Sequence, residues 1–372
     1  MFFEIKNLLR FLKLSKDEKE IIFYAEHAGY YPNFEGILKE LNIKSNKKFC
    51  YITSDINDPI LKNNDSKINS FYIKNFLPFF MLLVNCKVFV MTLTDLNQFH
   101  LKRSINNVHY VYVFHALVSS HMMYREGAFD HYDTILCVGP HHEKEIRKRE
   151  RDLNLKPKRL IQGGYYRLER ISNKYKNLNL DHDGKNILIA PSWGPQNIIE
   201  SCGIEIVKKL LDLKYKVMLR PHPETTKRSP EILKKYCDKF ADNENFVLQT
   251  DISGDEAMLK ADLLITDLSG IAFEYAFGTN RPVLFIDLPK KIQNKNYQKL
   301  GIDPFELSIR NQIGFVLKTE ELNNLENVVK NLINQKSLYK EKIKEIAEKS
   351  VYEFGNSSKV GAEIILKESM KI

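Results

Sequence analysis

Short apolar runs alternate with helix-length segments along most of the chain, and this alternation limits the folds it can adopt. Six runs precede a polar stretch near residue 180, and six more follow it. Continuous apolar strands separated by helices are typical of parallel sheets covered by helices on both faces. The runs are IIFYAE, KFCYITS, KVFVMTL, HYVYVFHA, TILCVG and RLIQGG, and then NILIAPS, KVMLRPHP, FVLQT, DLLITDLS, PVLFID and IGFVL. The pattern predicts two Rossmann-like domains.

Domain boundaries follow from the break between the two series. The polar stretch Ser172–Asp183 is the predicted linker, and Asn356 to Ser358 offers an N-cap for a last helix that ends near Lys371. We expect the α/β class with a GT-B architecture, in which two Rossmann-like domains face each other across a cleft and the C-terminal helix crosses back to the first. The expected parts are an amphipathic segment (1–15), an acceptor-side domain (16–175), a nucleotide-donor domain (176–350) and a crossing helix (351–372).

The composition narrows the class of partner. The 56 Lys and Arg residues against 47 Asp and Glu residues give a net charge of +9, which favours an anionic ligand, nucleic acid or an anionic membrane surface. We expect no nucleic acid, because no RNP, KH or helix-turn-helix signature occurs and the basic residues are spread out. The five cysteines are scattered and never form a CxxC pair, which indicates a reducing cytoplasm without disulfides or zinc.

The N-terminal segment has an amphipathic pattern. On a helical wheel its basic residues border one apolar face, which consists of Phe2, Ile5, Leu8, Leu9 and Leu12. Such a helix either lies in a membrane interface, next to Lys6, Arg10 and Lys13, or docks on the protein body. The pattern leaves both alternatives open. We expect no transmembrane segment, since the longest apolar run, from Phe76 to Leu93, is interrupted by polar residues.

Polar residues follow four of the predicted strands. Ligands of open α/β sheets bind beyond the carboxyl ends of the strands, so these residues are candidates for a site. They are His115 after HYVYVF, Ser192 and Trp193 after NILIAP, Arg220 to Pro223 after KVML, and Asp267 to Ser269 after DLLIT.

The stretch RPHP is the most informative of the four. Its prolines restrict the backbone on either side of a cation and an imidazole. Arg220 is suited to bind a phosphate, and His222 is suited to donate a hydrogen bond to one or to move a proton.

A second phosphate site is predicted where DLLIT passes into a helix. Ser269 lies near the N-cap, and the N–H groups of Gly270 and Ile271 are expected to approach a pyrophosphate at the positive end of the helix dipole. About one turn later, Glu274 is expected to accept hydrogen bonds from a ribose. No GxGxxG or Walker pattern occurs, which argues against NAD-dependent hydride transfer and P-loop ATPases.

In the first domain, His115 is predicted to take a proton from an acceptor hydroxyl, because it follows a strongly apolar strand. His121, His141 and His142 are weaker candidates. The pair at 141 and 142 has no HExxH or carboxylate–histidine spacing, so we expect neither a metal nor an organic cofactor.

Taken in order, these stretches resemble the CDP-glycerol glycerophosphotransferase family, which contains the teichoic-acid primases and polymerases. The resemblance covers roughly Tyr112 to Asp287 and differs from the family pattern at Ala116–Leu117, Gly194 and Gly270. The segments that carry it are FHALVSSH around His115, GGYYRLERI from Gly163, APSWG from Ala190, RPHP from Arg220 and TDLSGIAFEYA from Thr266.

The resemblance implies a metal-independent inverting transfer. His115 would act as the base, Arg220 and His222 would stabilise charge on the nucleotide diphosphate, and the segment around Ser269 would hold pyrophosphate and ribose. The implied donor is a CDP-activated polyol. The implied acceptor is a hydroxyl of a membrane-linked surface polysaccharide or teichoic-acid-like polymer, at the inner face of the cell membrane. The alternative is a GT-B glycosyltransferase that uses a nucleotide sugar in capsule or lipooligosaccharide synthesis.

Overall fold

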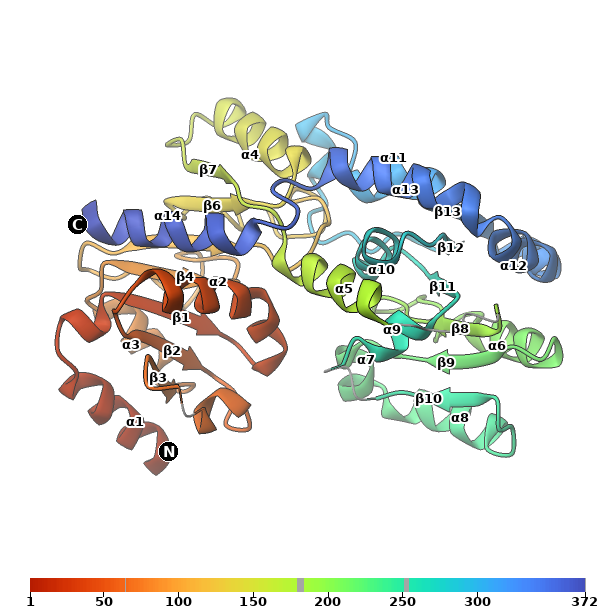
Figure 1. Cartoon of the computed structure of the whole chain (residues 1–372), viewed down its shortest axis with the longest axis horizontal. Helices are drawn as coiled ribbons and strands as arrows, with labels where there is room; N and C mark the ends of the chain where they lie inside the picture. Colours follow the sequence, from red (N-terminus) through yellow and green to blue (C-terminus); the bar gives the residue numbers. More distant parts are fainter. Residues whose placement is uncertain (64, 179–183, 251–253, 372) are drawn as a thin grey trace. The chain divides into compact units, whose positions relative to one another are not determined.

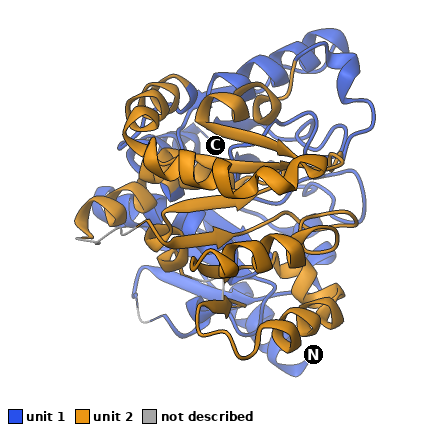
Figure 2. Ribbon diagram, turned by 90° about the vertical axis from the view of Figure 1, so that its right-hand side faces the viewer, with its two compact units in different colours: residues 1–167, 293–302, 350–372 blue, residues 168–292, 303–349 orange. Residues whose placement is uncertain are grey.

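The chain forms two compact units, which we describe separately. A computed structural model describes residues 1–63, 65–178, 184–250 and 254–371. Unit 1 comprises residues 1–167, 293–302 and 350–372, and unit 2 comprises residues 168–292 and 303–349 (Figure 2).

Among the described residues, unit 1 contains a parallel sheet of seven strands in the order β3-β2-β1-β4-β5-β6-β7. Six strands coincide with the predicted apolar runs. The sequence pattern does not predict β3, because its sequence INSFY contains Asn and Ser and it lies at the edge of the sheet. The strands are β1 (Ile21–Ala25), β2 (Phe49–Thr53), β3 (Ile68–Tyr72), β4 (Val88–Met91), β5 (His109–Val113), β6 (Thr134–Cys137) and β7 (Arg159–Gln162).

Unit 2 contains a parallel sheet of six strands in its described part, in the order β10-β9-β8-β11-β12-β13. In both sheets the strand order reverses next to the first strand of the unit. The reversal lies between β1 and β4 in unit 1 and between β8 and β11 in unit 2. This is the order of a Rossmann fold, so the predicted pair of Rossmann-like domains is confirmed. The strands are β8 (Asn186–Ile189), β9 (Lys216–Leu219), β10 (Phe246–Leu248), β11 (Leu263–Thr266), β12 (Val283–Asp287) and β13 (Gly314–Lys318).

Helices connect the strands in both units. In unit 1 they include α3 (Leu77–Leu83) and α4 (Pro140–Asp152). Between the strands of unit 2 lie α6 (Gly203–Asp212), α7 (Pro223–Arg228), α8 (Pro230–Phe240), α9 (Glu256–Lys260), α10 (Ile271–Thr279) and α11 (Phe305–Ile313), and the last strand is followed by α12 (Leu325–Asn334) and most of α13 (Lys336–Ser350). Isoleucine, leucine and valine side chains between sheet and helices form the core of unit 2.

The prediction of a linker from Ser172 is wrong for its first part. Helix α5 (Tyr166–Asn177) covers Ser172–Asn177, because Leu168 and Ile171 form an apolar helical stripe that packs against Gly278 of α10. Arg170 and Lys174 also bind the buried carboxylate of Asp255, with the closest N–O distances at 3.1 and 2.9 Å. The remainder of the predicted linker, residues 179–183, lies outside the described residues.

The last helix, α14 (Ser357–Lys371), packs along α2 (Tyr31–Lys44) of unit 1, as expected (Figure 1). The two helices approach closely: a Cβ atom built on Gly361 would lie 2.8 Å from Ile37, and one on Gly36 would lie 2.1 Å from Ser358 Oγ. Lys44 Nζ also binds Glu363 at 2.6 Å. The contact therefore requires glycine on both helices.

Helix α1 (Phe2–Lys13) docks on unit 1 through residues that are not those of its apolar stripe. The buried side chains of α1 are Glu4, Asn7 and Phe11. The Glu4 carboxylate accepts hydrogen bonds from the backbone N–H groups of Lys74 and Phe76, at 2.6 and 2.9 Å. The hydrogen bonds hold its pKa below the usual value although burial opposes the shift.

The apolar stripe of α1 faces solvent instead. Phe2 is 85% exposed, Leu9 54% and Leu12 67%, and Ile5 is also exposed. The helix therefore contacts the body, but through Glu4, Asn7 and Phe11 and not through the predicted stripe, of which Leu8 is half-buried and the other four residues are exposed. In the described part of the chain, no helix combines the length and the apolar character that a membrane span needs. All five cysteines are free thiols.

Candidate functional site

The loops that follow four neighbouring strands of unit 2 form the candidate site. Because β9, β8, β11 and β12 are adjacent and parallel, their carboxyl ends lie along one edge of the sheet. The reversal of strand order between β8 and β11 lies in the middle of this edge, where ligands of such sheets bind. Apart from His115 and the weaker candidates His121, His141 and His142, every site residue predicted from the sequence belongs to unit 2.

Asp267 connects the loops after β8 and β11. Its Oδ1 accepts a hydrogen bond from the backbone N–H of Ser192 at 2.7 Å, and its Oδ2 accepts one from Ser192 Oγ at 3.0 Å. Burial raises the pKa of Asp267, and the hydrogen bonds from Ser192 oppose this shift. Both residues thus fix the backbone next to Trp193.

Arg220 and His222 follow β9 as predicted. Arg220 is buried, and its backbone N–H donates to Ile189 of β8 at 2.8 Å. The His222 ring is the N-cap of α7, where its Nδ1 accepts a hydrogen bond from the backbone N–H of Glu224. Burial lowers the pKa of His222 to about 4, and the charge of Lys291 lowers it further. The ring is therefore neutral at pH 7, with its proton on Nε2.

Two cations that the sequence analysis did not single out lie on the indole of Trp193. Lys291 Nζ is 3.6 Å from the ring centroid and Arg228 Cζ is 4.9 Å from one of the rings. The His222 ring lies 6.2 Å from that of Trp193. Lys291 comes shortly after β12, so the rule of strand-end residues, applied to the run PVLFID, would have included it. Arg228 ends α7 and carries no such signal.

Helix α10 begins directly after the loop of β11. Gly270 is its N-cap and Ile271 its first residue, so Ser269 precedes the cap position. No side chain caps this helix end, and Ser269 and Gly270 are half-buried. Glu274 is buried in the first turn. The N-terminus of α10 thus lies at the same edge of the sheet as Arg220 and His222, and the amide groups of a helix N-terminus are suited to bind phosphate.

His115 follows β5 in unit 1, as predicted. Its Nδ1 lies 3.4 Å from the hydroxyl of Tyr112, and the rings of Tyr30 and Tyr124 meet it edge-on at 5.2 and 5.7 Å. Tyr165 donates its hydroxyl proton to the carbonyl of His115. Burial lowers the pKa of His115 to about 4, against a hydrogen bond with the Thr92 backbone. The imidazole is thus unprotonated at neutral pH, as a general base requires.

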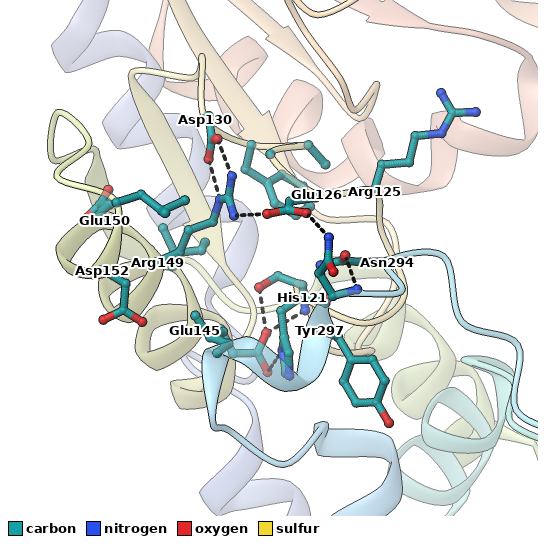
Figure 3. A pocket seen from close by; sticks show the side chains of 18 of the residues that line it. His121, Arg125, Glu126, Asp130, Glu145, Arg149, Glu150, Asp152, Asn294 and Tyr297 are labelled. Atoms are coloured by element: carbon teal, nitrogen blue, oxygen red, sulfur yellow. Dashed lines mark hydrogen bonds and ion pairs between the residues drawn. The ribbon is translucent and has the colours of Figure 1, made fainter.

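A hollow of ≈ 170 Å³ lies in unit 1 beside the loop that continues from His115 (Figure 3). His121 and Glu145 face each other there, with Nδ1 and Oε1 3.3 Å apart. Glu145 Oε2 accepts hydrogen bonds from the backbone and hydroxyl of Ser120, both at 2.6 Å, and His121 Nε2 contacts the carbonyl of Ile302 at 3.0 Å. Sequence reasoning missed Glu145, which lies inside a charged helical stretch.

The charges around this hollow are paired within unit 1. Arg149 binds Asp130 at 2.8 Å and Glu126 at 3.6 Å (Figure 3). Lys158 binds Glu150 at 3.5 Å. The two pairs of Arg149 connect the loop between β5 and β6 to helix α4. They therefore help to hold the loop that continues from His115.

Of the other two candidate histidines, His142 has a structural role. His142 is buried and stacks on Phe114 with ring centroids 3.6 Å apart. Its Nε2 donates to the carbonyl of Val118, and its Nδ1 accepts from the N–H of Val138. Burial lowers the pKa of His141, which neighbours it. In the residues that the structure describes, no cluster of three or more His, Cys, Asp or Glu side chains is arranged to hold a metal.

Solved structures with the same fold define the class of protein. The wall teichoic acid polymerase TagF, in a variant soaked with CDPG, is 17% identical, with 99% of this chain and 93% of that chain covered and a TM-score of 0.63. The UDP-GlcNAc 2-epimerase from Neisseria meningitidis bound to UDP-GlcNAc is 15% identical over 93% of this chain and 99% of that chain, with a TM-score of 0.60. The MnaA–UDP structure from S. aureus is 15% identical over 94% and 95%, also with a TM-score of 0.60. These similarities show a GT-B-like fold.

The sequence gives the family. The family model of CDP-glycerol:poly(glycerophosphate) glycerophosphotransferase matches residues 7–365. The chain therefore belongs to this family of enzymes, as the resemblance in the sequence predicts. No curated protein matches it in sequence.

Proposed function

We propose that this enzyme transfers glycerol phosphate, or a related polyol phosphate, from a CDP-activated donor to a hydroxyl of a membrane-linked, teichoic-acid-like or surface-polysaccharide acceptor. Family membership over residues 7–365 supports the donor and a poly(glycerophosphate) acceptor. The observation that carries the proposal is the strand-end site of unit 2, where Arg220 and His222 follow β9 and α10 follows β11, the two strands on either side of β8. A cation, an N–H donor and free helix amides are the groups that a diphosphate needs.

In this reaction the acceptor hydroxyl oxygen attacks the phosphorus that carries glycerol. A new P–O bond forms, the bond to the bridging oxygen breaks, and CMP leaves with the electron pair. His115 takes the hydroxyl proton. Arg220 and the Nε2–H group of His222 stabilise negative charge on the phosphate oxygens. The pyrophosphate is held by Ser269, Gly270 and Ile271. Glu274 binds the ribose. Ser192, Trp193 and Asp267 shape the donor side of the site.

The proposal also includes contact with the membrane, at its cytoplasmic face. The exposed stripe of α1, bordered by Lys6, Arg10 and Lys13, has the pattern of a helix that lies in a membrane interface. Glu4, Asn7 and Phe11 fix the helix to the body, so the exposed residues of the stripe are not needed to hold the helix in place. A membrane-linked acceptor would reach an enzyme held at that surface.

The decisive experiment identifies both donor and product. Thermal unfolding of the purified enzyme is measured with CDP-glycerol, CDP-ribitol and several UDP-sugars, because a ligand of the folded state raises the melting temperature. Phosphorus NMR then follows the stabilising donor with a glycerol-phosphate acceptor. We expect release of CMP together with a new phosphodiester. Stabilisation by a UDP-sugar alone, with a glycosidic product, would overturn the proposal in favour of a glycosyltransferase.

A further inference from the structure

Lys291 occupies an unusual position at the candidate donor site. It follows β12, it is half-buried, and its ammonium group rests 3.6 Å from the centroid of Trp193. Among the residues that the structure describes, no carboxylate lies within ion-pair distance of its Nζ. A cation removed from water without such a partner is costly, and the face of an indole compensates for only part of that cost.

The charged groups that face Lys291 come from the loop after β11 and from helix α7. Asp267, after β11, and Glu224, on α7, attract it, whereas Arg228 of α7 repels it. Both carboxylates have other partners: Asp267 accepts from Ser192, and Glu224 binds Arg228 Nε at 2.6 Å. Lys291 in turn lowers the pKa of His222. The cluster thus combines cations with acids that are already engaged.

We propose that Lys291 is a further phosphate-binding group of the donor site, and that its ammonium, held on Trp193, binds an oxygen of the donor diphosphate. This inference rests on the proposed function, because it assumes that the strand-end site of unit 2 holds the donor. An ammonium group is a strong point-charge partner for phosphate. Lys291 lies beside His222, so its positive charge is close to the Nε2–H group that the proposed reaction uses.

The inference has a pH signature. Burial lowers the pKa of Lys291 to about 8, and Arg228 lowers it further while Asp267 and Glu224 oppose the shift. A bound diphosphate favours the ammonium form, so its binding raises this pKa and takes up a proton when the free enzyme is deprotonated. Affinity for the diphosphate should therefore fall as the pH rises above 8, at most about tenfold per unit.

The single tryptophan of the chain makes this measurable, since Trp193 is the only source of indole fluorescence. Fluorescence titrations with CDP and with inorganic pyrophosphate at pH 7 to 9.5 compare the wild type, Lys291→Met, Lys291→Arg and the exposed neighbour Lys290→Met. We expect Lys291→Met to weaken binding of both probes about tenfold to a hundredfold. Lys291→Arg should bind tightly without the pH dependence, because arginine stays protonated. Lys290→Met should match the wild type.

The outcomes separate this inference from the proposed function. Equal binding by Lys291→Met and the wild type, with an unchanged pH profile, overturns the role of Lys291 alone. A wild type that binds neither probe overturns the donor site and with it this inference. A third outcome is a wild type that binds pyrophosphate through Lys291 but does not turn over CDP-glycerol. That result would support the role of Lys291 and reject CDP-glycerol as the donor. Circular dichroism verifies the fold of each variant, and Lys291→Arg keeps the test valid if Lys291→Met unfolds.

Discussion

The Nδ1 atom of His222 accepts a hydrogen bond of 3.1 Å from the backbone N–H of Glu224. The ring thus serves two purposes: Nδ1 caps α7, and Nε2 keeps the proton. An asparagine side chain also caps helices, yet it is too short to replace Nε2–H. His222→Asn should therefore preserve α7 while lowering turnover about 10²- to 10³-fold, as loss of one donor to a developing charge typically does.

Steady-state kinetics and thermal unfolding test this prediction together. His222→Ala, which also loses the cap, should show a similar loss of turnover with an additional loss of stability of about 1 kcal/mol. Near-normal turnover in His222→Asn would mean that Nε2 has no part in transfer.

His115→Gln should slow transfer strongly without weakening donor binding. The residue lies in unit 1, whereas the groups proposed for the donor lie in unit 2. We expect a loss of about 10²- to 10⁴-fold in turnover, and a dissociation constant for CDP-glycerol within twofold of the wild type. Calorimetry measures the second quantity. A large loss of donor affinity would contradict the role of His115 as base.

The pKa of His115 adds a prediction about pH to the same experiment. Because that pKa is lowered to about 4, the imidazole is already unprotonated at pH 5.5. Protonation of His115 should therefore not reduce turnover as the pH falls from 8 to 5.5. A loss of activity centred near pH 6.5, absent from His115→Gln, would show that the ring is not buried as described.

Charging the exposed stripe of α1 should release the enzyme from membranes. Leu9→Glu combined with Leu12→Glu should lower binding to vesicles that contain anionic lipid at least about tenfold, because two apolar side chains no longer enter the interface. The fold should be unaffected, since both residues are exposed. Ile43→Glu on α2, a residue 78% exposed, is the matched control. Equal vesicle binding by all variants in sedimentation would reject the membrane contact.

His142 should make the enzyme sensitive to acid. Burial lowers its pKa to about 4, and its Nδ1 accepts the N–H of Val138, so the folded state keeps it neutral. In the unfolded chain a histidine takes up a proton below about pH 6.5. Its contribution to stability is thus complete above pH 6.5 and is lost as the pH falls toward 4.

Urea unfolding between pH 7 and 4.5 measures this contribution. The free energy of unfolding of the wild type should fall more steeply than that of His142→Gln, by about 1.4 kcal/mol per pH unit. The exposed His100→Gln should follow the wild type. Parallel curves for wild type and His142→Gln would exclude His142 as the acid-sensitive group.

Apolar patterns in the sequence predicted most of this fold because buried parallel strands are continuously hydrophobic. The edge strand β3 escaped this rule, since Asn69 and Ser70 are tolerated where one side of a strand is unpaired. The rule that ligands bind at strand ends located Arg220, His222 and Asp267. It could not show that both carboxylate oxygens of Asp267 accept hydrogen bonds from Ser192, because those bonds depend on the distance between two loops.

The same limit applies to amphipathic helices. The periodicity of α1 identifies an apolar stripe, but the face that docks is decided by specific hydrogen bonds to Glu4 from residues about 70 positions later. Lys291 follows the run PVLFID and so carries the strand-end signal. Its contact with the indole of Trp193 depends on the distance between two loops, which the sequence does not show.

The close packing of α14 on α2 has a consequence for biosynthesis. Helix α2 emerges from the ribosome early, whereas the helix that covers it is made only after all of unit 2. During that interval the surface of α2 around Gly36 remains uncovered in the nascent protein, until α14 has been synthesised. Unit 1, whose synthesis begins first, therefore finishes folding last. A polypeptide that ended after α13 would lack α14, and its unit 1 would stay incomplete.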